Sequence, residues 1–203
     1  MTKLRIGIFG GSFNPPHIGH LVLASEAYDQ LHLDKVLWMV TGNPPHKPLD
    51  GMLDGESRSK MVELSIRGNC KFELSRIEMD RPGPHFAYET VRLVRAEYPG
   101  SELTYLIGED SLRDLPKWKH PNLLIAEVDH LGVMSRENVE TDLTELESVI
   151  PGIKSKVCYI NTPEIHISST EIRTRIAGGR EYRYFLHPAV YQSIRRGKYY
   201  KNG

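Results

Sequence analysis

Near its start the chain reads Gly10-Gly11-Ser12-Phe13-Asn14-Pro15-Pro16-His17-Ile18-Gly19-His20. The apolar run 4–9 before this stretch predicts a buried strand, and residues 21–28 after it predict a helix. A strand, a glycine turn and a helix N-terminus form an anion site, because unpaired backbone N–H groups converge there with the positive end of the helix dipole. His17 and His20, spaced i, i+3, share one face at the helix entrance, and Gly19 leaves room for close approach. The stretch indicates a site that places imidazoles against phosphates; two surface histidines after a turn are the simpler alternative.

The segment His17-Ile18-Gly19-His20 resembles the HxGH signature of the nucleotidylyltransferase superfamily, whose members join a nucleoside triphosphate to a phosphate or similar acceptor. The residues just before it look like the bacterial nicotinate mononucleotide adenylyltransferase branch. The resemblance implies that ATP is bound by Gly10, Gly11, Ser12, Phe13, His17 and His20, and that the acceptor contacts Ser12 and Asn14. Many bacterial relatives carry Asp where this chain has Asn14, so a turn or hydrogen-bonding role carries over there and a carboxylate role does not.

Length and composition set broad limits on the function. With 203 residues the chain is long enough for a single domain over 1–203, and its 26 acidic and 26 basic residues leave no net field that would attract nucleic acid or an anionic membrane. Cys70 and Cys158 lack C-x-x-C spacing, which favours reduced thiols and a cytoplasmic location. Neither a signal peptide nor a membrane-spanning run is expected. The oligomeric state stays open, and a homo-oligomer is compatible with the sequence.

Strand-like and helical patterns alternate along the chain. Strands are expected at 4–9, 35–40, 71–74, 103–107, 130–134 and 157–160, and helices at 21–28, 56–69, 87–98, 169–177 and 188–196. This alternation predicts an α/β fold, a Rossmann-like doubly wound parallel sheet with helices on both faces and a small C-terminal helical part. Ligands of such sheets bind beyond the carboxyl ends of the strands, where the strand order reverses. Gly10, the loop from Thr41 to Gly55 and Gly108 lie at such ends, so we expect them to meet in one crevice.

A second motif lies far from the first, at Ile167-Ser168-Ser169-Thr170-Glu171-Ile172-Arg173. Ser168 and Glu171 have capping-box spacing, and Gly178-Gly179 supplies a helix stop. Taken alone, the segment is a well-capped helix, although hydroxyls and an arginine at a helix N-terminus also suit a phosphate. It resembles the I-S-S-T-x-I-R motif of the same family, which grips the triphosphate of ATP. The resemblance implies that Ser168, Ser169 and Arg173 bind ATP.

Further polar residues follow other predicted strands. Lys47, in Asn43-Pro44-Pro45-His46-Lys47, matches the family's P-x-H-K element and would neutralise phosphate, although a loop lysine is normally solvated. Gly108 and Asp110 come directly after a strand, where a carboxylate suits ribose hydroxyls, or Asp110 serves as a helix N-cap. Arg136 follows the strand 130–134, where it either reaches phosphate or lies exposed on a loop.

The pyridine ring of the acceptor has two candidate contacts. Trp118 resembles the tryptophan of the family's L-P-x-W element, which stacks on that ring, although its polar neighbours also fit a half-buried surface aromatic. Phe86, Ala87 and Tyr88 align with a family segment that usually reads S-Y-T-x-D-T, so Ala87 lacks a threonine hydroxyl while its backbone N–H is retained. Amides of this loop are expected to receive the nicotinate carboxylate.

The implied reaction is adenylyl transfer from ATP to nicotinate mononucleotide, as in NAD biosynthesis, with no covalent enzyme intermediate. His17, His20, Lys47 and Arg173 are the expected catalytic residues, and no protein metal site is expected. Mg²⁺ would be held mainly by the substrate phosphates. Nicotinamide mononucleotide, another phosphate acceptor such as phosphopantetheine, or a non-catalytic nucleotide sensor are the alternatives. The segment 137–156 carries no informative pattern.

Overall fold

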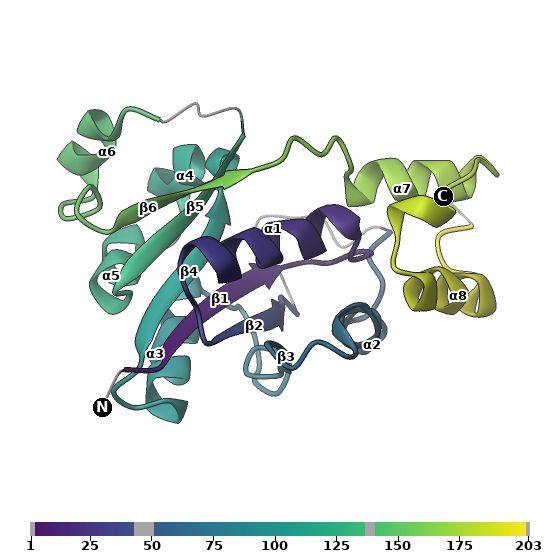
Figure 1. The fold of residues 1–203 in the computed structure, drawn as a ribbon, viewed down its shortest axis with the longest axis horizontal. Coiled ribbons are helices and arrows are strands. Elements are labelled where there is room, and N and C mark those ends of the chain that lie inside the picture. Colours follow the sequence, from purple (N-terminus) through teal and green to yellow (C-terminus); the bar gives the residue numbers. More distant parts are fainter. Residues whose placement is uncertain (1–2, 43–50, 137–140, 202–203) are drawn as a thin grey trace.

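The computed structural model describes residues 3–42, 51–136 and 141–201, with only the backbone of Arg136. Within this part of the chain, one six-stranded sheet has the order β3-β2-β1-β4-β5-β6, and every neighbouring pair is parallel (Figure 1). The strands are β1 (Arg5–Gly11), β2 (Lys35–Val40), β3 (Phe72–Ser75), β4 (Glu102–Gly108), β5 (His130–Arg136) and β6 (Val157–Thr162). The strand order reverses between β1 and β4, so the predicted doubly wound parallel sheet is confirmed.

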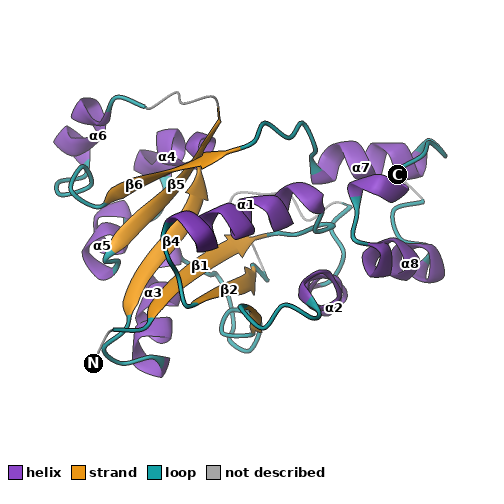
Figure 2. Ribbon diagram, viewed as in Figure 1, coloured by secondary structure: helices purple, strands orange, loops and turns teal. Residues whose placement is uncertain are grey.

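Helices cover both faces of this sheet, as predicted (Figure 2). They are α1 (Ile18–Gln30), α2 (Gly55–Ile66), α3 (Ala87–Glu97), α4 (Glu109–Asp114), α5 (Pro121–Glu127), α6 (Leu143–Val149), α7 (Ser169–Ala177) and α8 (Pro188–Gly197). Two short 3₁₀ turns lie at Leu115–Lys117 and Arg183–Phe185. In the described residues, no helix is long and apolar enough to cross a membrane.

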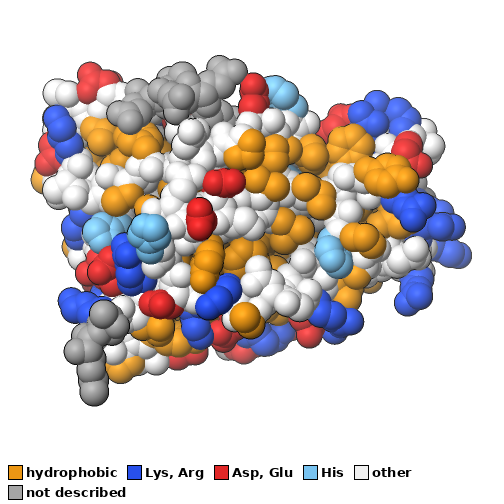
Figure 3. Space-filling view, viewed as in Figure 1, with side chains coloured by type: hydrophobic (Ala, Val, Ile, Leu, Met, Phe, Trp, Pro, Cys, Tyr) orange, Lys and Arg blue, Asp and Glu red, His pale blue; other side chains and the backbone are white. Residues whose placement is uncertain are grey.

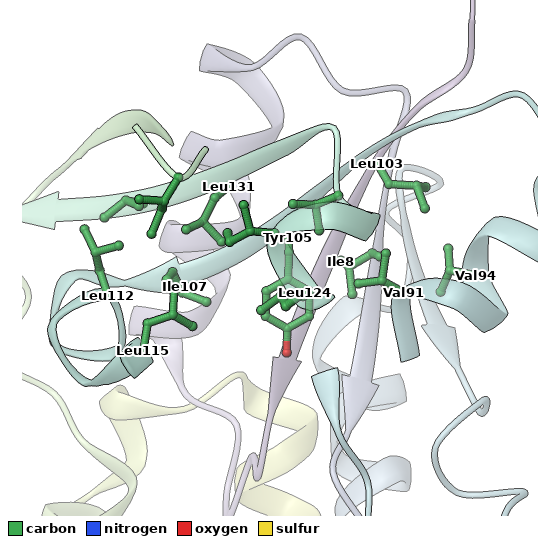
Figure 4. Close-up of a cluster of buried hydrophobic side chains, with 14 of the residues drawn as sticks. Ile8, Val91, Val94, Leu103, Tyr105, Ile107, Leu112, Leu115, Leu124 and Leu131 are labelled. Atoms are coloured by element: carbon green, nitrogen blue, oxygen red, sulfur yellow. The ribbon is translucent and has the colours of Figure 1, made fainter. Parts of the chain in front are cut away.

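The two faces follow from the period-2 alternation of side chains along each strand. On β1, Ile6 and Ile8 pack against α3 and α5, whereas Phe9 packs on the opposite face against α1 and α2. Figure 4 shows the first of these layers, in which Tyr105 lies among leucines and isoleucines and its hydroxyl oxygen projects away from the cluster. Both faces of the central strands are therefore buried, as their nearly continuous apolar runs require.

The largest differences from the sequence prediction concern short helices. Helices α4, α5 and α6 have only 6, 7 and 7 residues, too few for a 3.6-residue hydrophobic period to stand out, and none is among the expected helix ranges. Only the alternative role of Asp110 as an N-cap pointed to a helix near α4. Helix α2 ends at Ile66 rather than at 69, because Gly68 adopts a left-handed conformation with φ of 89°. Helix α1 begins at Ile18, directly after His17.

The C-terminal helical part docks on α2 through a third apolar cluster. Met61 of α2 packs with Ile172 of α7 and with Val190 and Ile194 of α8, all buried. This docking brings the N-terminus of α7 beside the loop between β1 and α1. There the Ser169 Oγ donates a hydrogen bond to the Pro15 carbonyl at 2.8 Å. The second sequence motif therefore reaches the first.

A buried arginine fixes the loops at the carboxyl edge of the sheet. Arg58 of α2 is 1% exposed and donates to four backbone carbonyls, those of Leu53 (2.8 Å), Ser12 (2.8 Å), Thr41 (2.9 Å) and Gly42 (3.2 Å). Within the described residues all of its hydrogen-bond acceptors are backbone carbonyls. One guanidinium therefore ties the loop after β1 to the loop after β2 and to the start of α2.

We predict that Arg58→Met lowers the free energy of unfolding by at least about 3 kcal/mol, because several buried carbonyls lose a charged donor. Urea unfolding followed by circular dichroism measures this change. Arg67→Met, at the exposed end of the same helix, is the matched control and should stay within about 0.5 kcal/mol of the parent. A loss below about 1 kcal/mol for Arg58→Met would contradict the assigned role.

Candidate active site

Two cavities adjoin at the carboxyl edge of the sheet and share Gly11 and Ser12 as lining residues. The histidine pocket, with a volume of about 510 Å³, includes among its lining Phe13, Asn14, His17, Gly19, His20, Ser168, Ser169, Thr170 and Arg173. The tryptophan pocket, with a volume of about 330 Å³, includes Gly10, Thr41, Glu78, His85, Phe86, Ala87, Gly108 and Trp118. The expectation that Gly10, the Thr41 loop and Gly108 meet in one crevice is confirmed.

The two histidines of the first motif face each other in the histidine pocket. Their ring centroids are 3.7 Å apart, and His20 Nδ1 accepts from the backbone N–H of His17 at 3.1 Å. A Cβ at Gly19 would lie 3.0 Å from His17 Nδ1, so the glycine does make room for the close approach. His17 is 7% exposed, its Nδ1 has no hydrogen-bond partner within the described residues, and burial lowers its pKa to about 4. The His17 imidazole is therefore neutral near pH 7.

The turn before α1 is held by an aromatic cluster. Phe13, 2% exposed and in the left-handed region with φ of 44°, packs edge-on against His20 at a centroid distance of 5.0 Å and against Phe9 at 5.5 Å. Few side chains adopt this backbone conformation without support from their surroundings. The packing of the Phe13 ring fixes both the turn and the orientation of His20.

The second motif contributes a second helix N-terminus to the histidine pocket. Ser168 caps α7 by accepting from the N–H of Glu171 at 3.1 Å, as its spacing predicts, and Gly178 follows the helix. Arg173 lines the pocket and donates to the Asn14 carbonyl at 2.9 Å. The N-termini of α1 and α7 thus face one cavity, and both favour negative charge.

Asn14 serves the architecture of this loop. Its side chain donates to the Gly51 carbonyl at 3.2 Å and accepts from the Leu53 N–H at 3.3 Å and from the Tyr200 hydroxyl at 2.7 Å. Each of these partners belongs to a segment that is distant in sequence. Asn14 therefore joins the first motif to the loop before α2 and to the C-terminal end of the chain.

The tryptophan pocket combines an aromatic wall with a third helix N-terminus. Trp118 is half-buried and stands edge-on to Tyr105, with ring centroids 6.5 Å apart. Phe86 and Ala87 line the cavity at the start of α3, where the first N–H groups have no carbonyl of the helix to bind. Tyr88 does not line it and instead donates its hydroxyl to Glu89 at 3.2 Å.

Besides Tyr88, three predicted site residues either point away from the pockets or have no described side chain. Lys47 falls outside the described residues, and Arg136 is the last residue of β5 without a described side chain. Asp110 lies in the first turn of α4, whose N-cap is Gly108; its side chain is 87% exposed and pairs with Arg113. The neighbouring Glu109 turns towards β5 and accepts from Thr141 at 2.9 Å.

The sequence prediction missed Glu78 and His85, which line the tryptophan pocket, and Arg58 beneath it. Glu78 and His85 belong to an irregular segment between β3 and α3, where no periodicity distinguishes buried from exposed positions. The proximity of both in sequence to Phe86, Ala87 and Tyr88 was the available signal.

The buried His17 makes folding stability depend on pH. Above its ordinary pKa of 6.5, the His17 ring is neutral in both the folded and the unfolded state and makes no pH-dependent contribution to stability. Between pH 6.5 and about pH 4, the ring takes up a proton in the unfolded chain but stays neutral in the folded chain. We predict a loss of about 3 kcal/mol as pH falls through this window, measured by urea unfolding. His17→Asn should lose less, whereas His32→Asn, on an exposed turn, should keep the parental loss. Equal losses in all three proteins would refute the assignment.

Comparison with known proteins shows similarity over nearly the whole chain. The family model described as cytidylyltransferase-like matches residues 8–175. The chain is 40% identical to a "probable nicotinate-nucleotide adenylyltransferase" of Thermomicrobium roseum, over 97% of this chain and 92% of that protein. It is 38% identical to one from Thermus thermophilus, over 98% of this chain and 100% of that protein.

Solved structures show the same fold at lower identity. The nicotinic acid mononucleotide adenylyltransferase of Plasmodium falciparum, complexed with NaAD, is 19% identical with a TM-score of 0.80, covering 100% of this chain and 99% of that one. The fold, the two facing motifs and the near full-length relatives all indicate the same family. The chain belongs to the cytidylyltransferase-like family and, within it, to the group of nicotinate-nucleotide adenylyltransferases.

Proposed function

We propose that the protein transfers the adenylyl group of ATP to nicotinate mononucleotide, giving nicotinate adenine dinucleotide and pyrophosphate. The observation that carries this proposal is the pair of pockets joined at Gly11 and Ser12, one with two helix N-termini and one with an aromatic wall. ATP would occupy the histidine pocket and the pyridine ring the tryptophan pocket, so that the two phosphates meet at the shared turn. The relatives with nearly full-length similarity carry this activity in their names.

In the reaction, a phosphate oxygen of the mononucleotide attacks the α-phosphorus of ATP in line. The bond from the α-phosphorus to the bridging oxygen breaks, and pyrophosphate leaves with that oxygen. No protein nucleophile is needed, so the protein contributes positioning and stabilisation of negative charge. His17 enters this step neutral and stabilises the phosphates through a ring N–H, because its burial disfavours the charged imidazole before the substrate binds.

The charge of the leaving group would be shared by several donors. Ser168, Ser169 and Arg173 stand at the α7 end of the histidine pocket, and we assign them to the triphosphate. His20 faces the same cavity and completes the set. Lys47 remains our proposal for an additional cation, on the basis of its sequence motif.

Mg²⁺ fits this pocket as a companion of the substrate. Its described lining offers imidazoles, hydroxyls and a guanidinium but no carboxylate, so the oxygen ligands that Mg²⁺ prefers would come mainly from the phosphates. When bound, the ion would neutralise phosphate charge. A cytoplasmic location stays a prediction, and a homo-oligomer stays compatible with the sequence.

Release of pyrophosphate from ATP, measured with each acceptor in turn, tests the proposed function. Nicotinate mononucleotide should support turnover and phosphopantetheine should not, because the flat aromatic wall suits a ring rather than an extended arm. Nicotinamide mononucleotide is the close alternative. ATP binding without pyrophosphate release from any acceptor would identify a nucleotide sensor and overturn the proposal.

We predict that His20→Ala lowers turnover by about 10²–10³ while leaving the thermal midpoint nearly unchanged, because a preorganised donor at the phosphates acts mainly in the transition state. Steady-state pyrophosphate release gives the rate and circular dichroism checks the fold. His32→Ala on the exposed turn is the control. Near-parental turnover of His20→Ala would remove the histidine pair from the reaction centre.

We predict that Trp118→Ala raises KM for nicotinate mononucleotide about tenfold or more while leaving KM for ATP unchanged, because the ring wall belongs to the tryptophan pocket alone. Initial rates with one substrate varied and the other saturating separate the two effects. An unchanged KM for the mononucleotide would refute stacking, and a matching rise in KM for ATP would place the ring elsewhere.

A further inference from the structure

A buried carboxyl group lines the tryptophan pocket with one oxygen unused. Glu78 lies between β3 and α3 and is 5% exposed. Its Oε1 accepts from the Thr90 hydroxyl at 2.7 Å, whereas Oε2 has no hydrogen-bond partner of normal geometry within the described residues. A buried acceptor left open in this way costs free energy unless a ligand completes it.

The position of Glu78 is tied to the N-terminus of α3. The hydroxyl of Thr90 in the first turns of that helix approaches both Glu78 Oε1 and, at 3.3 Å, the carbonyl of the N-cap residue Phe86. Phe86 and Ala87 line the same cavity as Glu78. A ligand group that reaches the first amides of α3 therefore lies close to the carboxyl of Glu78.

Groups on several elements act on the pKa of Glu78. Burial raises the pKa of Glu78, while Thr90, His85, Thr41 and Arg81 act in the opposite direction. Arg81, on the same segment as Glu78, is already paired with Glu89 at 3.1 Å. The Tyr105 hydroxyl and Lys119 face the pocket from β4 and from the segment before α5.

We propose that Glu78 Oε2 binds the substituent on the pyridine ring of the acceptor and that its proton decides between an acid and an amide. This inference rests on the proposed function. With its proton, Glu78 donates to the nicotinate carboxylate while the α3 amides bind the other oxygen. Without its proton, Glu78 accepts from the NH₂ group of nicotinamide and repels a carboxylate. The pocket thus selects the acid only while Glu78 keeps a proton.

The test is the ratio of kcat/KM for nicotinate mononucleotide to kcat/KM for nicotinamide mononucleotide, measured across the pH range over which the protein stays folded. Titration of the acceptor phosphate and of the ATP site affects both acceptors alike and cancels in the ratio. In the parent protein the ratio should fall by about tenfold or more as pH rises, since each unmatched polar contact costs about a factor of ten. In Glu78→Gln, which keeps the shape but cannot titrate, the ratio should stay constant within about twofold.

Two further variants identify the group that titrates. Glu89→Gln makes the same chemical change on the surface side of Arg81 and should keep the parental fall in the ratio. His85→Gln should also keep it, because the proposal assigns the titrating group to Glu78 and not to the neighbouring ring of His85. A fall that persists in Glu78→Gln but vanishes in His85→Gln would overturn the proposal. So would a flat ratio in the parent protein, or identical ratios in the parent and in Glu78→Gln at every pH.

Separate control experiments check the folding of the variants and the proposed function. Thermal unfolding checks that Glu78→Gln is folded, and Glu78→Asp, which retains a titrating carboxyl, should keep the pH-dependent fall at lower efficiency. Dinucleotide formation by the parent protein tests the proposed function by itself. Turnover of either acceptor with no effect of Glu78→Gln on the ratio would overturn the role of Glu78 alone.

Discussion

The site depends on a positive charge buried beneath it. Arg58 binds the Ser12 and Thr41 carbonyls from below, and because each peptide unit is planar and trans, the N–H group of the same unit must point away from the guanidinium. These units belong to residues that line the two pockets. The polar contacts of Arg58 therefore orient backbone at the junction of the pockets, and its charge adds to the field of the helix N-termini there.

The C-terminal helical part completes the histidine pocket. Ser169 and Arg173 of α7 bind the Pro15 and Asn14 carbonyls, and Tyr200 near the C-terminus binds the Asn14 side chain, so two segments hold the same turn. Figure 3 shows that Lys and Arg side chains gather over the end of the molecule formed by α7 and α8. A chain with equal numbers of acidic and basic residues thus presents a local positive region beside the cavity that we assign to ATP.

The sheet, its carboxyl edge and the meeting of the two motifs could be predicted from the sequence, because glycine turns, helix caps and apolar runs determine structure locally. The sequence was insufficient where a residue departs from its local pattern. Arg58 belongs to a helix whose range was expected, but nothing in its local pattern marked this arginine as buried, and four backbone carbonyls surround it. Asp110 follows a strand as expected, yet α4 begins one residue earlier and turns that side chain outwards. Such outcomes depend on tertiary contacts that no single segment encodes.

The two pockets differ in charge in a way that suits two unlike ligands. The described lining of the histidine pocket holds no acidic side chain, and the N-termini of α1 and α7 face it. A polyanion bound there is therefore stabilised by the positive ends of both helix dipoles. The tryptophan pocket includes the carboxyl of Glu78 and an aromatic wall, so a triphosphate placed there would meet an acid and apolar surface. A planar ring with one small polar substituent loses little in the second pocket and gains nothing in the first. With each ligand in the pocket that we propose for it, the shared turn at Gly11 and Ser12 would bring the reacting phosphates together.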